Sequence, residues 1–306
     1  MDKLKEQYNP FPPVQRTISD LSTKYKSKYF QATEIITWLL VIVPLLLFFT
    51  AYLSDLQYTN LSEIVGIVSV ILLVLSLTSE LLIINHGYAK KWQICRSVAE
   101  SLKRESWFYC SCMESYPKTD SDASNIHWIQ VEKELLQKLI DNRIFLESGN
   151  QEEFFITTDM EKVRNLKVLE KWNFYKSARL QEQITWYDEQ SNHNRNLKRN
   201  YSILLALLMA ISVISAVVLI FLIKNYIEIT EIVVASILAT KTYSNARQFD
   251  SLEFTYNNTF IQLTALRDEN KESDISSESR LIELVKLVEN TISREHEVWV
   301  IKSFSR

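Results

Sequence analysis

The sequence predicts an all-α membrane protein with two duplicated transmembrane helical hairpins (four spans) and long helical cytosolic extensions. Three observations lead to this fold class. The apolar residues are concentrated in blocks long enough to cross a membrane. The 306 residues include only three glycines, where an average composition gives roughly 20. Tight β-turns and phosphate-binding loops that need glycine are therefore not expected. The apolar pattern of the first half also recurs in the second half.

Four segments approach the ~20 apolar residues that a membrane-spanning helix needs. The first carries no charge, and its Pro44 is tolerated in lipid. The fourth is the weakest, because Glu228, Glu231 and Lys241 lie within it. The predicted spans are Ile35–Leu53, Ser62–Ile84, Tyr201–Ile223 and Ile227–Tyr243.

The flanks of these segments repeat as well. A shift of 168 residues places Ile35–Leu53 on Ile203–Phe221 and Leu61–Val65 on Ile229–Val233. Each half has a basic segment, a long span, a short connection and a second span with an acidic start. The repetition predicts an internal duplication, and it makes the weak fourth segment a span.

Basic residues indicate the orientation. Lys24, Lys26 and Lys28 precede the first span and Lys90 and Lys91 follow the second, whereas the connection SDLQYTNLSE contains no Lys or Arg. Since cytosolic flanks carry the excess of Lys and Arg, both termini and the middle of the chain are predicted to be cytosolic. The polar first thirty residues, with three prolines, do not have the pattern of a signal peptide.

The expected organisation has four parts: a cytosolic N-terminal segment (1–30), a two-span hairpin with its cytosolic helix (31–116), a cytosolic linker (117–157) and a second hairpin with cytosolic helices (158–306). The linker opens on the turn-rich PKTDSDASN. Thr158 and Glu161 fit a capping box, from which one helix is expected to run into the third span. Ser276 or Ser277 is expected to start a C-terminal helix.

One face of the second span carries small and polar residues. Ser62, Gly66, Ser69, Ser76 and Glu80 recur at helical spacing. Such a stripe is either a packing seam between helices or the wall of a pore. A carboxylate in lipid favours the pore, with Glu63 and the equivalent Glu231 as further acidic rings and Leu73 as an apolar gate.

A second group of residues is cationic. Arg164, Lys167 and Lys171 are expected to share one helical face, with Arg179 beyond them. This group is a candidate site for an anionic ligand such as a nucleotide. The alternative is a solvated face beside acidic neighbours.

Other classes of function find little support in the sequence. The net charge of −3 does not indicate nucleic-acid binding. The three cysteines suggest reduced thiols, and Cys110 and Cys112 lack further ligands at metal-binding spacing, so no metal and no cofactor are expected. His, Ser, Cys and carboxylate residues form no recognisable catalytic pattern, so no enzyme is predicted.

The flanking segments resemble the SLATT family, the two-transmembrane effector domains associated with bacterial nucleotide-signalling defence operons. The resemblance lies in KYKSKYF and KKWQICRSVAESLKRESWFY in the first half, and in ARLQEQITWYDEQS and VENTISREHEVW in the second. It implies a tandem SLATT protein of the bacterial inner membrane. It also implies a pore-forming effector that responds to a nucleotide or oligonucleotide from a partner nucleotidyltransferase.

The leading functional hypothesis is therefore an oligomeric channel or pore in the lipid membrane, gated from the cytosolic helices and acting in anti-phage defence. Four spans cannot enclose a useful aqueous pore alone, so a homo-oligomer is required. The alternative is a non-conducting membrane scaffold or sensor that recruits a partner through its cytosolic helices.

Overall fold

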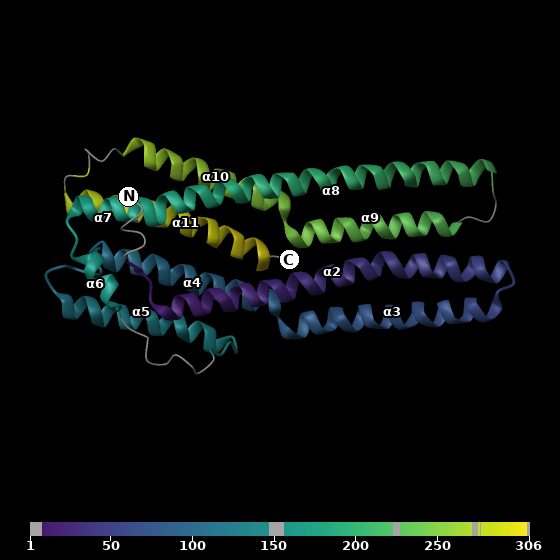
Figure 1. The fold of residues 1–306 in the computed structure, drawn as a ribbon, viewed down its shortest axis with the longest axis horizontal. Coiled ribbons are helices and arrows are strands. Elements are labelled where there is room, and N and C mark those ends of the chain that lie inside the picture. Colours follow the sequence, from purple (N-terminus) through teal and green to yellow (C-terminus); the bar gives the residue numbers. More distant parts are fainter. Residues whose placement is uncertain (1–7, 147–155, 223–226, 271–274, 276, 305–306) are drawn as a thin grey trace. The chain divides into compact units, whose positions relative to one another are not determined.

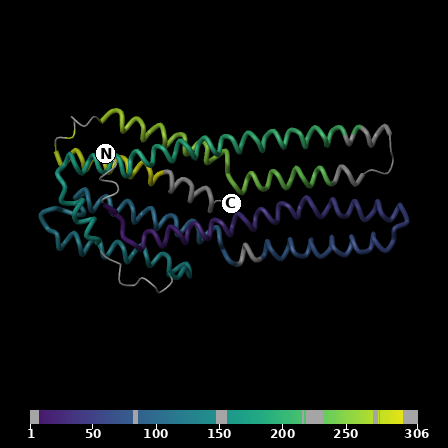
Figure 2. The backbone as a smooth tube through the Cα atoms, in the orientation of Figure 1, coloured from purple at the N-terminus to yellow at the C-terminus, as the bar shows by residue number. Residues whose placement is uncertain are grey.

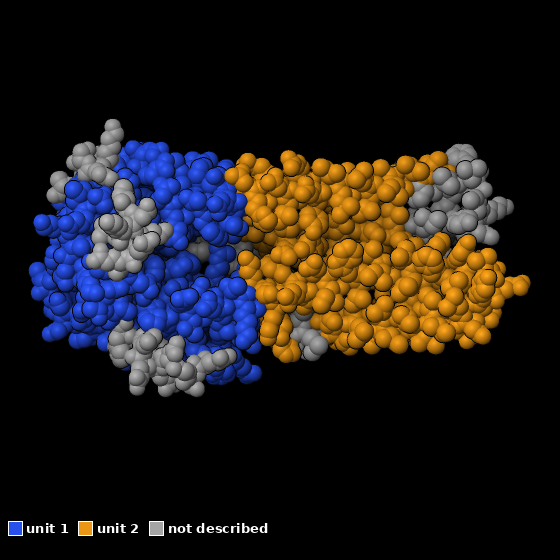
Figure 3. All heavy atoms as spheres, in the orientation of Figure 1, with its two compact units in different colours: residues 1–25, 89–191, 254–306 blue, residues 26–88, 192–253 orange. Residues whose placement is uncertain are grey.

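The computed structural model describes residues 8–146, 156–222, 227–270, 275 and 277–304. Within these ranges, the side chains of 82–85, 215–216, 218–222, 227–231 and 295–304 lie outside the description. Every regular element in the described ranges is helical, which confirms the all-α prediction (Figure 1). The chain forms two compact units (Figure 3). We call residues 26–88 and 192–253 the hairpin unit, and 1–25, 89–191 and 254–306 the stem unit.

The hairpin unit contains both predicted hairpins, which the trace in Figure 2 follows. Helix α2 (Pro13–Asp55) turns back into α3 (Thr59–His86), and α8 (Gln181–Leu222) is followed by α9 (Ile227–Arg247). The first turn closes where Tyr58 N donates to Leu53 O at 3.0 Å, with Gln57 in the left-handed region at φ 64°.

Three described helical stretches are long and apolar enough to cross a membrane: Pro13–Asp55, Thr59–Leu81 and Val168–Ile214. They include the whole of the first predicted span and overlap the second and third, up to Leu81 and Ile214. The fourth span, within α9, stays a prediction.

Each hairpin is followed by a further helix after a sharp break. Gly87, at φ 58°, separates α3 from α4 (Tyr88–Cys110), and Gln248, at φ 55°, separates α9 from α10 (Phe249–Glu269). The left-handed conformation suits glycine and strains other residues, so it ends each helix sharply. The second half thus repeats the first in its breaks as well as in its helices.

The stem unit is a packed helical unit. It contains α4, α5 (Ser121–Asp141), α6 (Thr158–Arg164), α7 (Val168–Tyr175), the five-residue π-helix η1 (Lys176–Leu180), α10 and α11 (Glu278–Phe304). One apolar core joins Val14 and Ile18 of α2 to α4 and α5. Its further members are Cys95, Val98, Ala99, Leu102, Leu135, Leu139 and Ile144.

Two expectations about the helices need correction. The helix expected to run from Asp159 into the membrane is interrupted, because α6 ends at Arg164 and α7 begins only at Val168. The N-cap of α6 is Thr157 and not Thr158, since the Thr157 hydroxyl accepts from Met160 N at 3.2 Å. At the start of α11, Ser277 does accept from Arg280 N, at 3.3 Å, which confirms that helix start.

Candidate functional site

The small residues of the α3 stripe pack inside the first hairpin. Ser62, Ser69 and Ser76 are buried, and the Ser62 hydroxyl donates to Thr50 O of α2 at 2.9 Å. A Cβ added at Gly66 would lie 3.5 Å from Thr50 Cγ2, an ordinary contact distance. Ser62 and Gly66 therefore pack against Thr50 of α2, and Ser69 and Ser76 are buried on the same face of α3. We call these four residues the seam, an arrangement that small residues allow in lipid.

The remaining stripe residues behave differently. Glu63, Leu73 and Glu80 are exposed on the hairpin unit, and the side chain of Glu231 lies outside the described residues. Leu73 retains 47% of its exposure, beside many other exposed apolar side chains of α3 such as Ile67 and Val70. A surface this apolar is one that lipid or another subunit covers.

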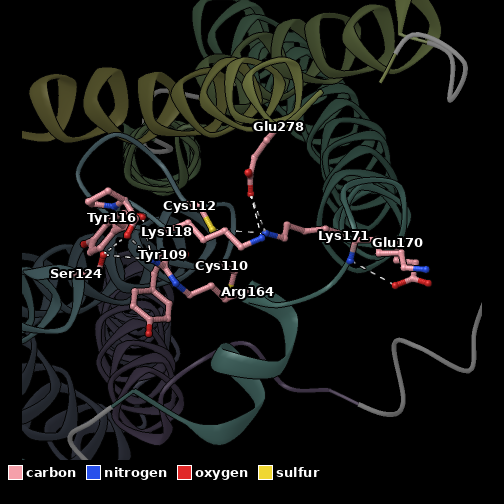
Figure 4. Close-up of polar contacts among 12 residues, drawn as sticks. Tyr109, Cys110, Cys112, Tyr116, Lys118, Ser124, Arg164, Glu170, Lys171 and Glu278 are labelled. Carbon is pink, nitrogen blue, oxygen red and sulfur yellow. Dashed lines mark hydrogen bonds and ion pairs between the residues drawn. The ribbon is translucent and has the colours of Figure 1, made fainter. Parts of the chain in front are cut away.

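Arg164 is a structural cross-link in this chain. It is only 5% exposed, and its guanidinium donates to Tyr109 O at 2.6 Å, Pro117 O at 2.9 Å, Tyr116 O at 3.1 Å and Ser124 Oγ at 3.2 Å (Figure 4). Tyr109 lies in the last turn of α4, where free carbonyls give the helix a negative end. Arg164 thus joins the end of α4 to the turn before α5.

Lys171 is also buried, at 2% exposure, but its contacts are longer. Its Nζ lies 3.6 Å from Cys112 Sγ and 3.8 Å from Oε1 of Glu278, the first residue of α11 (Figure 4). Lys118 reaches the same Glu278 oxygen at 3.9 Å. Lys167 is exposed as the N-cap residue of α7. The four cations therefore do not share one helical face.

Arg179 lies in the π-helix and forms a buried ion pair with α11. Its Nε donates to Glu289 Oε1 at 2.9 Å and its Nη2 to Oε2 at 3.0 Å, a two-pronged contact. Tyr175 donates its hydroxyl to the same carboxylate at 3.0 Å, and Glu100 lies 3.7 Å from Nη2. Burial disfavours the guanidinium charge, but Glu289 outweighs it and raises the pKa of Arg179 above its usual value.

Burial also raises the pKa of the Tyr175 phenol well above its ordinary range, and the Glu289 charge adds to this effect. This cluster ties the C-terminal helix to the base of the long helix α8.

Glu289 and Glu132 are the buried charged groups that sequence reasoning missed. Glu289 follows Leu284, Val285 and Val288 and precedes Ile292, all buried on one face of α11. Glu132 lies between Trp128 and Leu135 on the buried face of α5. A carboxylate at an apolar helical position is the signal that could have identified both.

The environment of Glu132 favours its neutral form. The side chain is 3% exposed, and neither its Oε1 nor the Trp128 Nε1 has a hydrogen-bond partner among the described residues. Burial raises the pKa of Glu132 from 4.5 to about 7, and the nearby Trp128 indole opposes the shift only in part.

Glu132 should therefore make stability depend on pH. Its pKa is higher in the folded chain, so its contribution is fully present below pH 4.5 and is lost as the pH rises through about 7. Glu132→Gln should remove this component, which amounts to at most about 3 kcal/mol. The check is the thermal midpoint of both proteins from pH 4.5 to 8.5. A midpoint difference that does not change with pH would contradict it.

The cysteines and possible metal ligands suggest no reactive centre. Cys95, Cys110 and Cys112 are free and buried, and burial raises the pKa of Cys95 and of Cys110 to about 12, which keeps both thiols protonated. In the described ranges, no three His, Cys, Asp or Glu side chains gather where they could hold a metal ion.

The repeated hairpins and their helical extensions agree with two family matches. Residues 12–172 match the SMODS and SLOG-associating 2TM effector domain 3, and residues 175–299 match the SMODS and SLOG-associating 2TM effector domain 1. The chain belongs to the SLATT family. The tandem SLATT arrangement confirms the resemblance. No curated protein and no solved structure matched significantly.

The family and the apolar helices together make this SLATT protein a membrane protein. Each of the two matched domains is a two-transmembrane effector domain. The matched ranges meet between Trp172 and Tyr175, directly before the π-helix that holds Arg179. Arg179 thus lies directly after the junction of the two SLATT domains, and it pairs with Glu289 near the end of the second matched range.

Proposed function

We propose that this SLATT protein is an oligomeric channel or pore of the bacterial inner membrane, with both termini in the cytosol. A nucleotide or oligonucleotide made by a partner nucleotidyltransferase opens it, and the membrane of a phage-infected cell is disturbed as a result. The observation that supports this proposal is the continuity of the long helices. Helices α2 and α8 each begin in the stem unit and continue without a break into the hairpin unit. A movement at the stem therefore reaches both hairpins through hydrogen-bonded helix.

We propose different roles for the two arginines and the two lysines of the cationic group. Arg164 and Arg179 have short contacts to internal partners, so they hold the stem together. Lys171 has only long contacts to Cys112 and Glu278, and Lys167 is exposed. In our proposal an anionic ligand competes with Glu278 for Lys171 and thereby releases the start of α11, with Lys167 as a nearby exposed contact.

The proposed pathway uses the exposed part of the stripe. Glu63 and Glu80 supply negative charge that favours cations, with Glu231 in the equivalent place of the second hairpin, and Leu73 supplies an apolar constriction. Ser62, Gly66, Ser69 and Ser76 support this surface as the seam behind it, and they line the pathway only if α2 and α3 separate on opening.

The test is ion flux through liposomes that contain the purified full-length protein, with and without a panel of cyclic and linear oligonucleotides. We expect ligand-dependent flux with a preference for cations. Glu80→Gln should lower that preference, because the carboxylate lies on the proposed pathway, whereas Glu134→Gln, an exposed carboxylate of the stem unit, should not change it. Intact oligomers that conduct no ions under any of these conditions would favour the scaffold function instead.

A further inference from the structure

The hairpin unit contains a cavity that the channel proposal does not use. It has a volume of about 350 Å³ and is lined by α2, α8 and α9. All its lining residues belong to the hairpin unit. A cavity of this size fits a small organic molecule, since ligand pockets begin at about 300 Å³.

Each of the three helices lines the cavity with one face, over about two helical turns. The lining runs from Glu34 to Val41 on α2, from Tyr201 to Leu208 on α8 and from Tyr243 back to Ser236 on α9. Seven residues of helix correspond to a depth of about 10 Å. Glu34 is exposed and therefore lies at the opening, where Tyr201 is within electrostatic range of it. The rings of Tyr201 and Tyr243 are 5.4 Å apart.

Four polar side chains of this lining, Glu34, Thr37, Ser236 and Thr240, offer hydrogen-bond acceptors to a ligand. The hydroxyl of Thr37 donates to Thr33 O at 2.8 Å, so only its lone pairs are free for a ligand. The hydroxyls of Ser236 and Thr240 likewise donate to carbonyls of their own helix, at 2.9 and 2.8 Å. An ionised carboxylate only accepts, and Glu34 has no hydrogen-bond or ion-pair partner among the described residues.

Positive charge is missing from the wall. Among the described residues, no Lys or Arg lines the cavity. Arg247 lies outside the lining but contacts it: its Nε donates to the hydroxyl of the lining Tyr243 at 3.0 Å, and its guanidinium lies 3.8 Å from the ring centroid of Phe30. Glu34 is thus the one charged side chain among the described residues of the lining. Trp38, Tyr201 and Tyr243 offer aromatic faces that attract cations.

We propose that this cavity binds an organic ammonium ion carried on a small apolar body. The ammonium group donates to Glu34 and to the threonine oxygens beside the aromatic rings, as a charge-assisted contact. The apolar body occupies the deeper part, between Val41, Leu204 and Leu208. Such a ligand joins the first hairpin to the second, because α2 belongs to one and α8 and α9 to the other.

The test is direct binding to the full-length protein in nanodiscs, followed by saturation-transfer NMR and calorimetry. The probes are 2-phenylethylamine, its neutral analogue 2-phenylethanol and the anion 3-phenylpropionate. We expect one saturable site per chain and at least tenfold tighter binding of the amine than of the alcohol. Empty nanodiscs give the contribution of lipid partitioning, and the readout does not depend on ion flux.

Two variants identify the site. Glu34→Gln should abolish the preference for the amine, because it removes the carboxylate and changes an exposed residue. Ala239→Leu should prevent saturable binding of both compounds, because it fills the cavity. Asp55→Asn, at an exposed carboxylate of the same unit outside the cavity, is the matched control and should bind like the parent. Equal binding of amine and alcohol, or an unchanged preference in Glu34→Gln, would overturn the proposal.

Discussion

Glu289→Leu should lower the free energy of unfolding of the stem unit by about 3–5 kcal/mol, the usual cost of removing one partner of a buried ion pair. Glu289 is fully buried, and the substitution leaves the Arg179 guanidinium without its two-pronged contact. It also deprives the Tyr175 hydroxyl of its acceptor. Chemical denaturation measures the loss, and hydrogen exchange in α11 and η1 locates it.

A double-mutant cycle separates the ion pair from simple packing. Arg179→Met with Glu289→Leu replaces both charges by apolar groups, which is often close to neutral. We therefore expect the double variant to be more stable than either single one. Glu100→Gln, at the more distant carboxylate, should have a smaller effect. If the two single losses simply add, the pair contributes no coupling and the assignment is wrong.

Arg164→Met should lower stability by about 3 kcal/mol or more, because buried carbonyls without donors cost about 1–3 kcal/mol each. The guanidinium serves three carbonyls and one hydroxyl from a single planar group. The stability of Arg164→Lys should lie between that of the parent and that of Arg164→Met, since an ammonium cannot make all of these contacts in the same geometry. The measurement is denaturation in the absence of any nucleotide.

This experiment also distinguishes the two roles considered for Arg164. If Arg164 served mainly to bind an anionic ligand, the ligand-free Arg164→Met variant would be as stable as the parent. Lys167→Met is the matched control, because Lys167 is exposed. It should change stability little. Equal stability of the parent and Arg164→Met would return Arg164 to the list of direct ligand contacts.

The hairpins could be predicted because their signals are local. The length of the apolar segments, the repeated flanks and the serine cap of the C-terminal helix each depend on a few neighbouring residues. In the structure the first three predicted spans lie in helices, and the C-terminal helix starts after Ser277. The fourth segment shows the limit: α9 is helical, but its acidic start weakens the hydropathy signal, so its prediction as a span depends on the repeat of the first hairpin.

The candidate sites were harder to predict, because they depend on which residues meet across long sequence distances. Arg164 was expected to share a helical face with Lys167 and Lys171, yet its acceptors lie forty or more residues earlier in the chain. The break at Asn165–Lys167 contains no Gly or Pro to announce it. The α3 stripe could be recognised from its spacing, but spacing cannot show which partner helix covers it.

The π-helix accommodates one extra residue in a helical turn close to the junction of the two SLATT domains. Trp172 and Tyr175 are buried before it, Leu180 is buried as its last residue, and Ile184 and Tyr187 are buried after it. The buried position therefore advances by five residues from Tyr175 to Leu180 and by three or four residues at the other steps of this series. In a regular helix one extra residue would turn everything beyond it by about 100°. The wide turn absorbs that residue instead. Two copies of a domain can therefore be joined in one continuous rod while each keeps its own inward side, and Arg179 meets Glu289 at the point of adjustment.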